Sequence, residues 1–241
     1  MSEIDRPSAK TRVPPHDTPA TPGNPRVRMR EIAVLSDNWY TLRKAEFDYK
    51  QRDGSWSRQS REAYDRGNGA TILLYDPAAG TILLTRQFRL PAYLNDHPDG
   101  MLLEAPAGLL DDEDAEAAIR REAEEETGVR VGGVQRLFQL FMSPGSVTER
   151  VAFFAAPYEA GAAQRHAGVA GEGEHIEVVE LPFERALEMV SSGEIADGKT
   201  VILLQWAAAN VFGADGSSGL LPATTPAADV LGDRVDQVPD G

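Results

Sequence analysis

The fold is decided by the acidic stretch AGLLDDEDAEAAIRREAEEETGV, residues 107–129. Its spacing predicts a helix over 114–127, because small and aliphatic residues recur three and four positions apart and therefore share one side of a helix. Gly128 follows at the place where a glycine commonly ends a helix. The apolar stripe consists of Ala115, Ala118 and Ile119.

Three carboxylates prolong that stripe towards the C-terminal end of the predicted helix: Glu122, Glu125 and Glu126. An apolar stripe faces the core, so these acids are turned towards the protein body, where grouped negative charges are costly without a cation. Hard cations such as Mg²⁺ bind carboxylates together with substrate phosphates, so the pattern favours a magnesium site. The alternative is a solvated acidic face, which is our interpretation of Asp111, Asp112, Glu113, Asp114, Glu116 and Glu124.

On both sides of this helix the sequence predicts short strands separated by turn signals such as Asp53-Gly54. Two further helices are predicted over 183–191 and 198–212. This order indicates an α/β (α+β) fold with a sheet core and helices packed on it. The predicted strands cover 31–35, 40–49, 56–64, 70–75, 81–88, 134–142, 149–158 and 176–181.

Both ends of the chain have the composition of tails. Residues 1–28 contain six prolines among small and charged residues, and such a segment buries too little apolar surface to offset its chain entropy. We therefore expect a disordered tail over 1–28 and a flexible C-terminal tail over 214–241. Between them we expect an N-terminal antiparallel strand region over 29–66 and the main domain over 67–213.

Composition excludes several classes of protein. The chain has 241 residues, 41% of them hydrophobic, which is enough for a buried core. A formal net charge of -14 without any basic run argues against nucleic-acid binding. The absence of Cys excludes disulfides and thiolate catalysis and favours a reducing compartment. With no signal peptide and no apolar run long enough for a membrane, we expect a cytoplasmic protein without a membrane partner.

The second half of the acidic stretch resembles the Nudix box. Residues 121–129 match its pattern R-E-U-x-E-E-x-G-U, where U is aliphatic, at every fixed position. The first half usually has the spacing G-x5-E-x7-R, whereas here Gly108 precedes Glu113 by one residue fewer, so Ala107 takes the glycine position when the helix is aligned. The resemblance to Nudix hydrolases implies the Nudix fold, a mixed β-sheet core sandwiched by helices, and metal-dependent hydrolysis of a diphosphate.

The resemblance extends over about residues 31–212. It is closest to the GDP-mannose pyrophosphatases within the ADP-ribose pyrophosphatase-like group. The supporting strings are DNWYTL (37–42), YDRGNGA (64–70), RQFR (86–89), MSPG (142–145) and DGKT (197–200).

This resemblance implies a metal site for Mg²⁺, with Mn²⁺ as an alternative. Its ligands would be Glu122, Glu126, the backbone carbonyl of Ala107 and a loop acid that matches Glu174. Glu172 competes with Glu174 for that place, and either could instead act as general base on the attacking water. An exposed Gly-rich acidic loop is the alternative interpretation of both residues.

Two other residues of the box have supporting roles in this picture. Arg121 would orient the box glutamates by ion pairing rather than touch the substrate. Glu125 would be a metal ligand, or a base that does not contact the metal itself but lies next to its ligands.

A second group would hold the nucleotide sugar. Guanidinium groups suit it, because they bind phosphate oxygens with two parallel hydrogen bonds. Judged alone, Arg89 is an ordinary surface residue and Lys199 an ordinary charge at a helix start. Tyr40 is a core or dimer contact, or a base-stacking group supplied by the partner of a homodimer. The implied substrate residues are Tyr40, Arg61, Glu62, Arg89, Ala107, Gly108, Glu149 and Lys199.

The predicted reaction is hydrolysis of GDP-mannose to GMP and mannose 1-phosphate. ADP-ribose is the rival substrate, since nothing in the sequence separates guanine from adenine. A catalytically inactive Nudix-fold module that binds nucleotides is the rival from another class, and an acidic cation-binding interaction protein ranks last.

Overall fold

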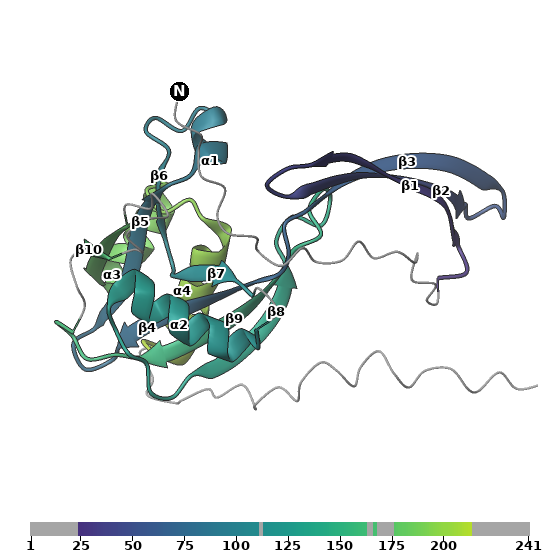
Figure 1. The fold of residues 1–241 in the computed structure, drawn as a ribbon. Coiled ribbons are helices and arrows are strands. Elements are labelled where there is room, and N and C mark those ends of the chain that lie inside the picture. Colours follow the sequence, from purple (N-terminus) through teal and green to yellow (C-terminus); the bar gives the residue numbers. More distant parts are fainter. Residues whose placement is uncertain (1–23, 111–112, 163–165, 168–175, 214–241) are drawn as a thin grey trace, which may run out of the picture.

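The computed structural model describes residues 24–110, 113–162, 166–167 and 176–213. A three-stranded sheet of the N-terminal strands projects from a larger body built on an eight-stranded sheet (Figure 1). The elements are β1 (Val27–Asp37), β2 (Thr41–Lys50), β3 (Trp56–Asp65), β4 (Gly69–Asp76), β5 (Thr81–Phe88), α1 (Leu90–Leu94), β6 (Met101–Glu104), β7 (Ala107–Leu109), α2 (Ala115–Thr127), β8 (Gln135–Phe141), β9 (Arg150–Pro157), β10 (His166–Ala167), β11 (Ile176–Pro182), α3 (Phe183–Ser192) and α4 (Gly198–Asn210).

The body sheet is mixed. Its strands follow the order β10-β11-β5-β4-β9-β8, with β6 paired to β5 and β7 paired to β4. Strands β4 and β9 run parallel at its centre, and both are nearly continuous apolar runs, as expected for strands that are covered on both faces.

Helices cover both faces of this sheet. Ile72 and Phe154 point to one face, where they join a buried cluster with Ile119 of α2. Leu73 and Phe153 point to the other face and pack in a cluster with residues of α3 and α4, among them Leu203. The predicted sheet between helices is therefore confirmed, and α2 is held against β4 by its own apolar stripe.

The projecting sheet is antiparallel in the order β1-β2-β3. Strand β1 begins earlier than predicted, because Val27 pairs with Tyr49 and the Arg28 guanidinium lies 3.8 Å from the centre of the Trp56 ring. The predicted tail boundary at residue 28 is corrected accordingly. The other parts of the two predicted tails, 1–23 and 214–241, lie outside the described residues.

A short junction connects this sheet to the body. The backbone N–H of Tyr64 donates to Ser146 (2.8 Å), and Thr148 donates back to Tyr64 (3.0 Å). Asp65 forms an ion pair with Arg43 and accepts a hydrogen bond from the Thr148 hydroxyl (3.1 Å). Burial alone would raise the pKa of Asp65, but these partners hold it below its ordinary value.

Apolar side chains are exposed along the projecting sheet. Half or more of Val34 and Trp39 is accessible, and Leu35 is close to that. Within the ranges that the structure describes, no helix is long and apolar enough to cross a membrane.

Candidate active site

Helix α2 carries the acidic box. It starts at the Asp114 carboxylate, which accepts hydrogen bonds from the N–H groups of Glu116 (3.0 Å) and Ala117 (3.3 Å). It ends at Gly128, whose φ of 74° is a left-handed conformation that glycine adopts without strain. Both predicted ends are thus confirmed.

Strand β7 places its backbone against the box glutamates. Glu126 is only 6% exposed, and its Oε2 accepts a hydrogen bond from the Ala107 N–H at 3.3 Å. Gly108 touches Glu122 so closely that an added Cβ would lie 2.5 Å from Cγ and closer still to the carboxyl group. The steric need for glycine therefore falls on Gly108, one residue after the position that the box alignment assigned to it.

Arg121 shares its charge among three carboxylates. Its guanidinium lies 3.2 Å from Glu122, 2.9 Å from Glu125 and 3.5 Å from Glu113. Partial burial would lower the pKa of Arg121, yet the charge of Glu122 and its neighbours raises it. Arg121 thus pairs with several glutamates of the box, and Glu125, whose side chain is 37% exposed, is one of its partners.

A second charged cluster lies beside the box and centres on Glu104, the last residue of β6. Its side chain is only 3% exposed and accepts two hydrogen bonds from Arg89, at 2.7 Å and 3.0 Å. The ammonium group of Lys199 pairs with the same carboxylate and with Asp197 (3.0 Å). Arg89 and Lys199, predicted separately as substrate residues, are thus brought together.

The electrostatics of the Glu104 cluster reach the box. Burial lowers the pKa of Arg89, but its hydrogen bond with Glu104 and the charges of Glu126 and Asp197 raise it. For Glu104 the effect of burial has the opposite sign and raises the pKa. The hydrogen bonds and charges of Arg89 and Lys199 outweigh burial, so the pKa of Glu104 is lowered below its ordinary value. Arg89 and Glu104 are therefore both charged at neutral pH, and Arg89 also feels the charge of Glu126 in the box.

Glu149 also lies near the box. A Cβ atom added to Gly69 would meet the Gly108 carbonyl oxygen at 3.1 Å and Glu149 Oε1 at 3.4 Å. Gly108 and the Glu149 carboxylate therefore both lie against Gly69. Arg66 Nε is 3.5 Å from Glu149 Oε1, and the Arg66 guanidinium lies 5.6 Å from the centre of the Tyr40 ring. Arg66 therefore links predicted substrate residues of the body and of the junction.

Arg61 and Glu62 lie elsewhere. Both are exposed on β3 of the projecting sheet, opposite Ala45 and Lys44. The recorded side-chain bonds of Arg61 are to Ser60 and Gln59 of its own strand. Within one chain, then, the structure does not bring these two residues to the box.

The protein offers carboxylate oxygens for a metal ion where β7 meets α2. Glu122 and Glu126 lie there against the backbone of Ala107 and Gly108, which is the kind of oxygen set that hard divalent cations prefer. Over the described part of the chain, no three acidic or imidazole side chains are grouped closely enough to hold a metal by themselves. The expected loop acid, Glu174 or Glu172, falls outside the described residues.

Sequence reasoning missed Glu104, Asp197 and Arg66. Glu104 had a detectable signal, because it is a lone acid in the apolar run Met101–Ala105, and a buried charge needs partners. Asp197 and Arg66 were inside strings that supported the family resemblance, but nothing local indicated their contacts.

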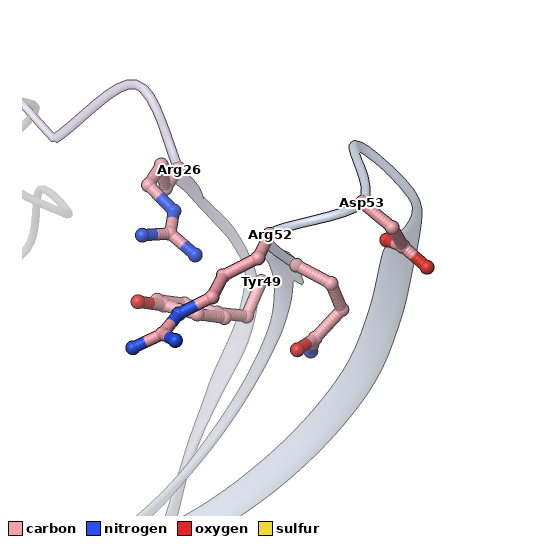
Figure 2. Close-up of a pocket in the computed structure, with 5 residues that line it drawn as sticks. Arg26, Tyr49, Arg52 and Asp53 are labelled. Atoms are coloured by element: carbon pink, nitrogen blue, oxygen red, sulfur yellow. The ribbon is translucent and has the colours of Figure 1, made fainter.

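An open concavity of about 550 Å³ lies at the turn between β2 and β3, where Figure 2 shows Arg26, Tyr49, Arg52 and Asp53. This turn is at the opposite end of β3 from Tyr64, where the projecting sheet joins the body. The concavity is therefore remote from the box glutamates and is not the candidate active site.

Two family models match the chain. The model described as the GDP-mannose pyrophosphatase NudK N-terminal domain matches residues 26–64, and the NUDIX domain model matches residues 65–203. The division between the two matches falls at the junction of the projecting sheet with the body.

Curated relatives agree with these matches. The chain is 56% identical over 177 residues to the GDP-mannose pyrophosphatase of Pectobacterium atrosepticum, which covers 73% of this chain and 91% of that protein. The GDP-mannose pyrophosphatase of Yersinia pestis is 56% identical over 183 residues, covering 76% and 91% of the two chains. That of Salmonella paratyphi B is 55% identical over 175 residues, covering 72% and 90%.

Proposed function

Because the chain belongs to the Nudix hydrolase family, we propose that it hydrolyses the diphosphate of a nucleotide sugar, GDP-mannose, to GMP and mannose 1-phosphate. The observation that carries this proposal is the packing of Glu122 on Gly108 beside the buried Glu126. It gathers acidic oxygens on a backbone support, as metal-assisted phosphoryl chemistry requires. The names of the relatives support the choice of GDP-mannose.

The residues that would hold the metal are Glu122, Glu126, the carbonyl of Ala107 and the loop acid Glu174. A bound Mg²⁺, or Mn²⁺ in its place, would neutralise phosphate charge and lower the pKa of a water molecule. Arg121 keeps Glu122 and Glu125 in fixed orientations through its ion pairs, so the ligand geometry is set before substrate arrives.

The remaining residues act on the substrate. Arg89 and Lys199 hold the diphosphate oxygens, and Glu149 contacts the sugar. The oxygen of water adds to one phosphorus, the bridging P–O bond breaks, and the proton of the water passes to a carboxylate of the site. Two phosphate monoesters then leave.

We also propose a homodimer in which the projecting sheet contributes to the partner's site. This sheet exposes Val34, Leu35 and Trp39. Residues 26–66 contain ten Lys or Arg and seven Asp or Glu, whereas residues 67–213 contain ten and 23, so a basic projecting sheet is complementary in charge to the acidic body of a second copy. Arg61 and Glu62 would then complete the site of the second copy, which explains their distance from their own box.

Mixing of variants tests this arrangement. Arg61→Ala and Glu122→Gln should each be inactive, and subunit exchange between them should restore about a quarter of the wild-type activity, because one composite site in four regains both residues. Light scattering should give the mass of a dimer. A monomer, or no recovery on exchange, would refute the shared site.

The activity itself is tested by incubating the protein with Mg²⁺ and a panel of nucleotide sugars that includes GDP-mannose and ADP-ribose. Mass spectrometry identifies both products, and ¹⁸O-water shows which phosphorus is attacked. Glu122→Gln is the inactive control. A preference for ADP-ribose would show that ADP-ribose, and not GDP-mannose, is the substrate. Tight binding of the nucleotide sugar without any monoester product would show that the protein is a binding module and not an enzyme.

A further inference from the structure

Glu104 has an unusual position for an acidic residue. It is buried at the end of β6, and both of its oxygens are engaged by cations from other elements. Arg89 directly precedes α1, and Lys199 lies in the first turn of α4. One carboxylate therefore fixes two cationic side chains that come from opposite directions along the chain.

The surrounding contacts hold this carboxylate in place. The backbone N–H of the next residue, Ala105, donates to the Thr200 hydroxyl oxygen at 2.7 Å. That hydroxyl donates to Asp197 (2.6 Å), the second carboxylate beside Lys199. The end of β6 and the start of α4 are thus joined by hydrogen bonds as well as by the ion pairs.

The charges of the four side chains balance. Arg89 and Lys199 are compensated by Glu104 and Asp197, so two like charges are kept close together without net repulsion. Over the described residues, no acceptor is bonded to Nη1 of Arg89, so this guanidinium keeps a donor for a ligand. A diphosphate presents pairs of oxygens that such spaced donors fit.

We infer that Glu104 is a positioning residue for the diphosphate: it holds Arg89 and Lys199 at the separation at which both bind phosphate oxygens. This inference rests on the proposed function, since it assigns Arg89 and Lys199 to the substrate. Glu104 itself touches neither metal nor substrate. Its removal should therefore weaken substrate binding while the metal site of α2 stays intact.

The test compares Glu104→Gln and Glu104→Asp with the wild type in the full chain. Steady-state kinetics with GDP-mannose gives KM and kcat, and titration with Mn²⁺ alone, followed by electron paramagnetic resonance, reports the metal site. Asp76→Asn is the control, because the Asp76 carboxylate accepts hydrogen bonds from the backbone N–H groups of Ala78, Ala79 and Ala160 at the turn between β4 and β5, the opposite end of β4 from Gly69. Thermal unfolding of every variant shows whether it is folded.

Glu104→Gln should lower kcat/KM by about 10- to 100-fold, mainly through KM, as for supporting residues around other active sites. Its Mn²⁺ affinity should equal that of the wild type. Glu104→Asp should recover part of the loss, because the charge remains while its reach shortens. Asp76→Asn should leave KM unchanged.

A double-mutant cycle separates positioning from a general loss of structure. If Glu104 acts through Arg89, adding Glu104→Gln to Arg89→Ala should raise KM much less than it does in the wild-type background. Full additivity, or an unchanged KM in a folded Glu104→Gln variant, would overturn the inference. Loss of activity in Glu122→Gln together with a normal Glu104→Gln would leave the proposed function standing and reject Glu104 alone.

Discussion

Gly108→Ala is the substitution with the most specific expected effect. The backbone of Gly108 does not have a positive φ, so alanine fits its conformation. The new methyl group, however, would lie 2.5 Å from Cγ of Glu122, with the carboxyl group closer still. Because the obstacle is the flexible end of a side chain, Glu122 has to move while the strand stays in place.

The size of the effect follows from this displacement. Cγ of Glu122 must retreat by about 1 Å to reach an ordinary contact of 3.4 Å. Mg²⁺ requires nearly ideal octahedral geometry, and a misplacement of about 1 Å can cost about 100-fold in rate, which is about 2.7 kcal/mol of transition-state stabilisation. A shifted rotamer costs only about 1 kcal/mol of folding stability, and the loss of a flexible glycine offsets part of that.

The assay measures kcat/KM for GDP-mannose, Mn²⁺ affinity and the melting temperature. We expect Gly108→Ala to lose activity and metal affinity while its melting temperature stays within about 4 °C of the wild type. Gly133→Ala is the control, because a Cβ at that glycine meets no atom within 4 Å. Wild-type turnover and Mn²⁺ binding in Gly108→Ala would refute the placement of Glu122 as a ligand, and unfolding would show that the strand rather than the side chain absorbs the clash.

Three further outcomes are expected. Arg121→Ala should reduce kcat/KM about tenfold or more, because three carboxylates lose their shared cation. Arg121→Lys should keep part of the activity. If Arg121→Ala had the same kcat/KM as the wild type, an orienting role for Arg121 would be excluded. Mg²⁺ at a hundred times its dissociation constant should raise the unfolding free energy of the wild type by about 2.7 kcal/mol, and with it the melting temperature, but should not change Glu122→Gln; calorimetry with and without metal decides this. The pKa of Asp65 is lowered below 3.8 in the folded protein, so its charged form stabilises the fold above that pH and this contribution is lost as the pH falls through the folded pKa. The difference in melting temperature between wild type and Asp65→Asn should therefore be constant well above pH 3.8 and shrink as the pH falls below it.

The sequence predicts the long elements of this fold because their signals are strong. Helix α2 has an acidic N-cap, an apolar stripe and a terminal glycine, and each of these features is found in the structure. Strands β4 and β9 are apolar runs bounded by polar residues. By contrast, β6 and β7 have four and three residues, too few for any periodicity to be visible.

The candidate site is predicted only where its residues carry a local pattern. Glu122 and Glu126 are spaced by one helical turn, so their common direction can be read from the sequence. The meeting of Glu104 with Lys199 joins residues that are 95 positions apart, and no local pattern encodes such a contact. The position of Arg61 on a separate sheet is a similar case, because it depends on how whole strands pair.

Two acidic clusters of the described residues differ in how their negative charge is compensated, and we expect the chemistry at the one on α2. Glu104 is compensated within hydrogen-bonding distance by two cations of the protein, so it gains little from an added metal ion. On α2, a single cation, Arg121, is shared by Glu113, Glu122 and Glu125, with the buried Glu126 one turn further along. In these contacts of the described residues, one guanidinium is set against three carboxylates, which is an excess of negative charge, and we expect a divalent cation to lower the free energy there more than at Glu104. Because the cations around Glu104 lie next to that excess, a diphosphate can be held by protein cations on one side and by metal on the other.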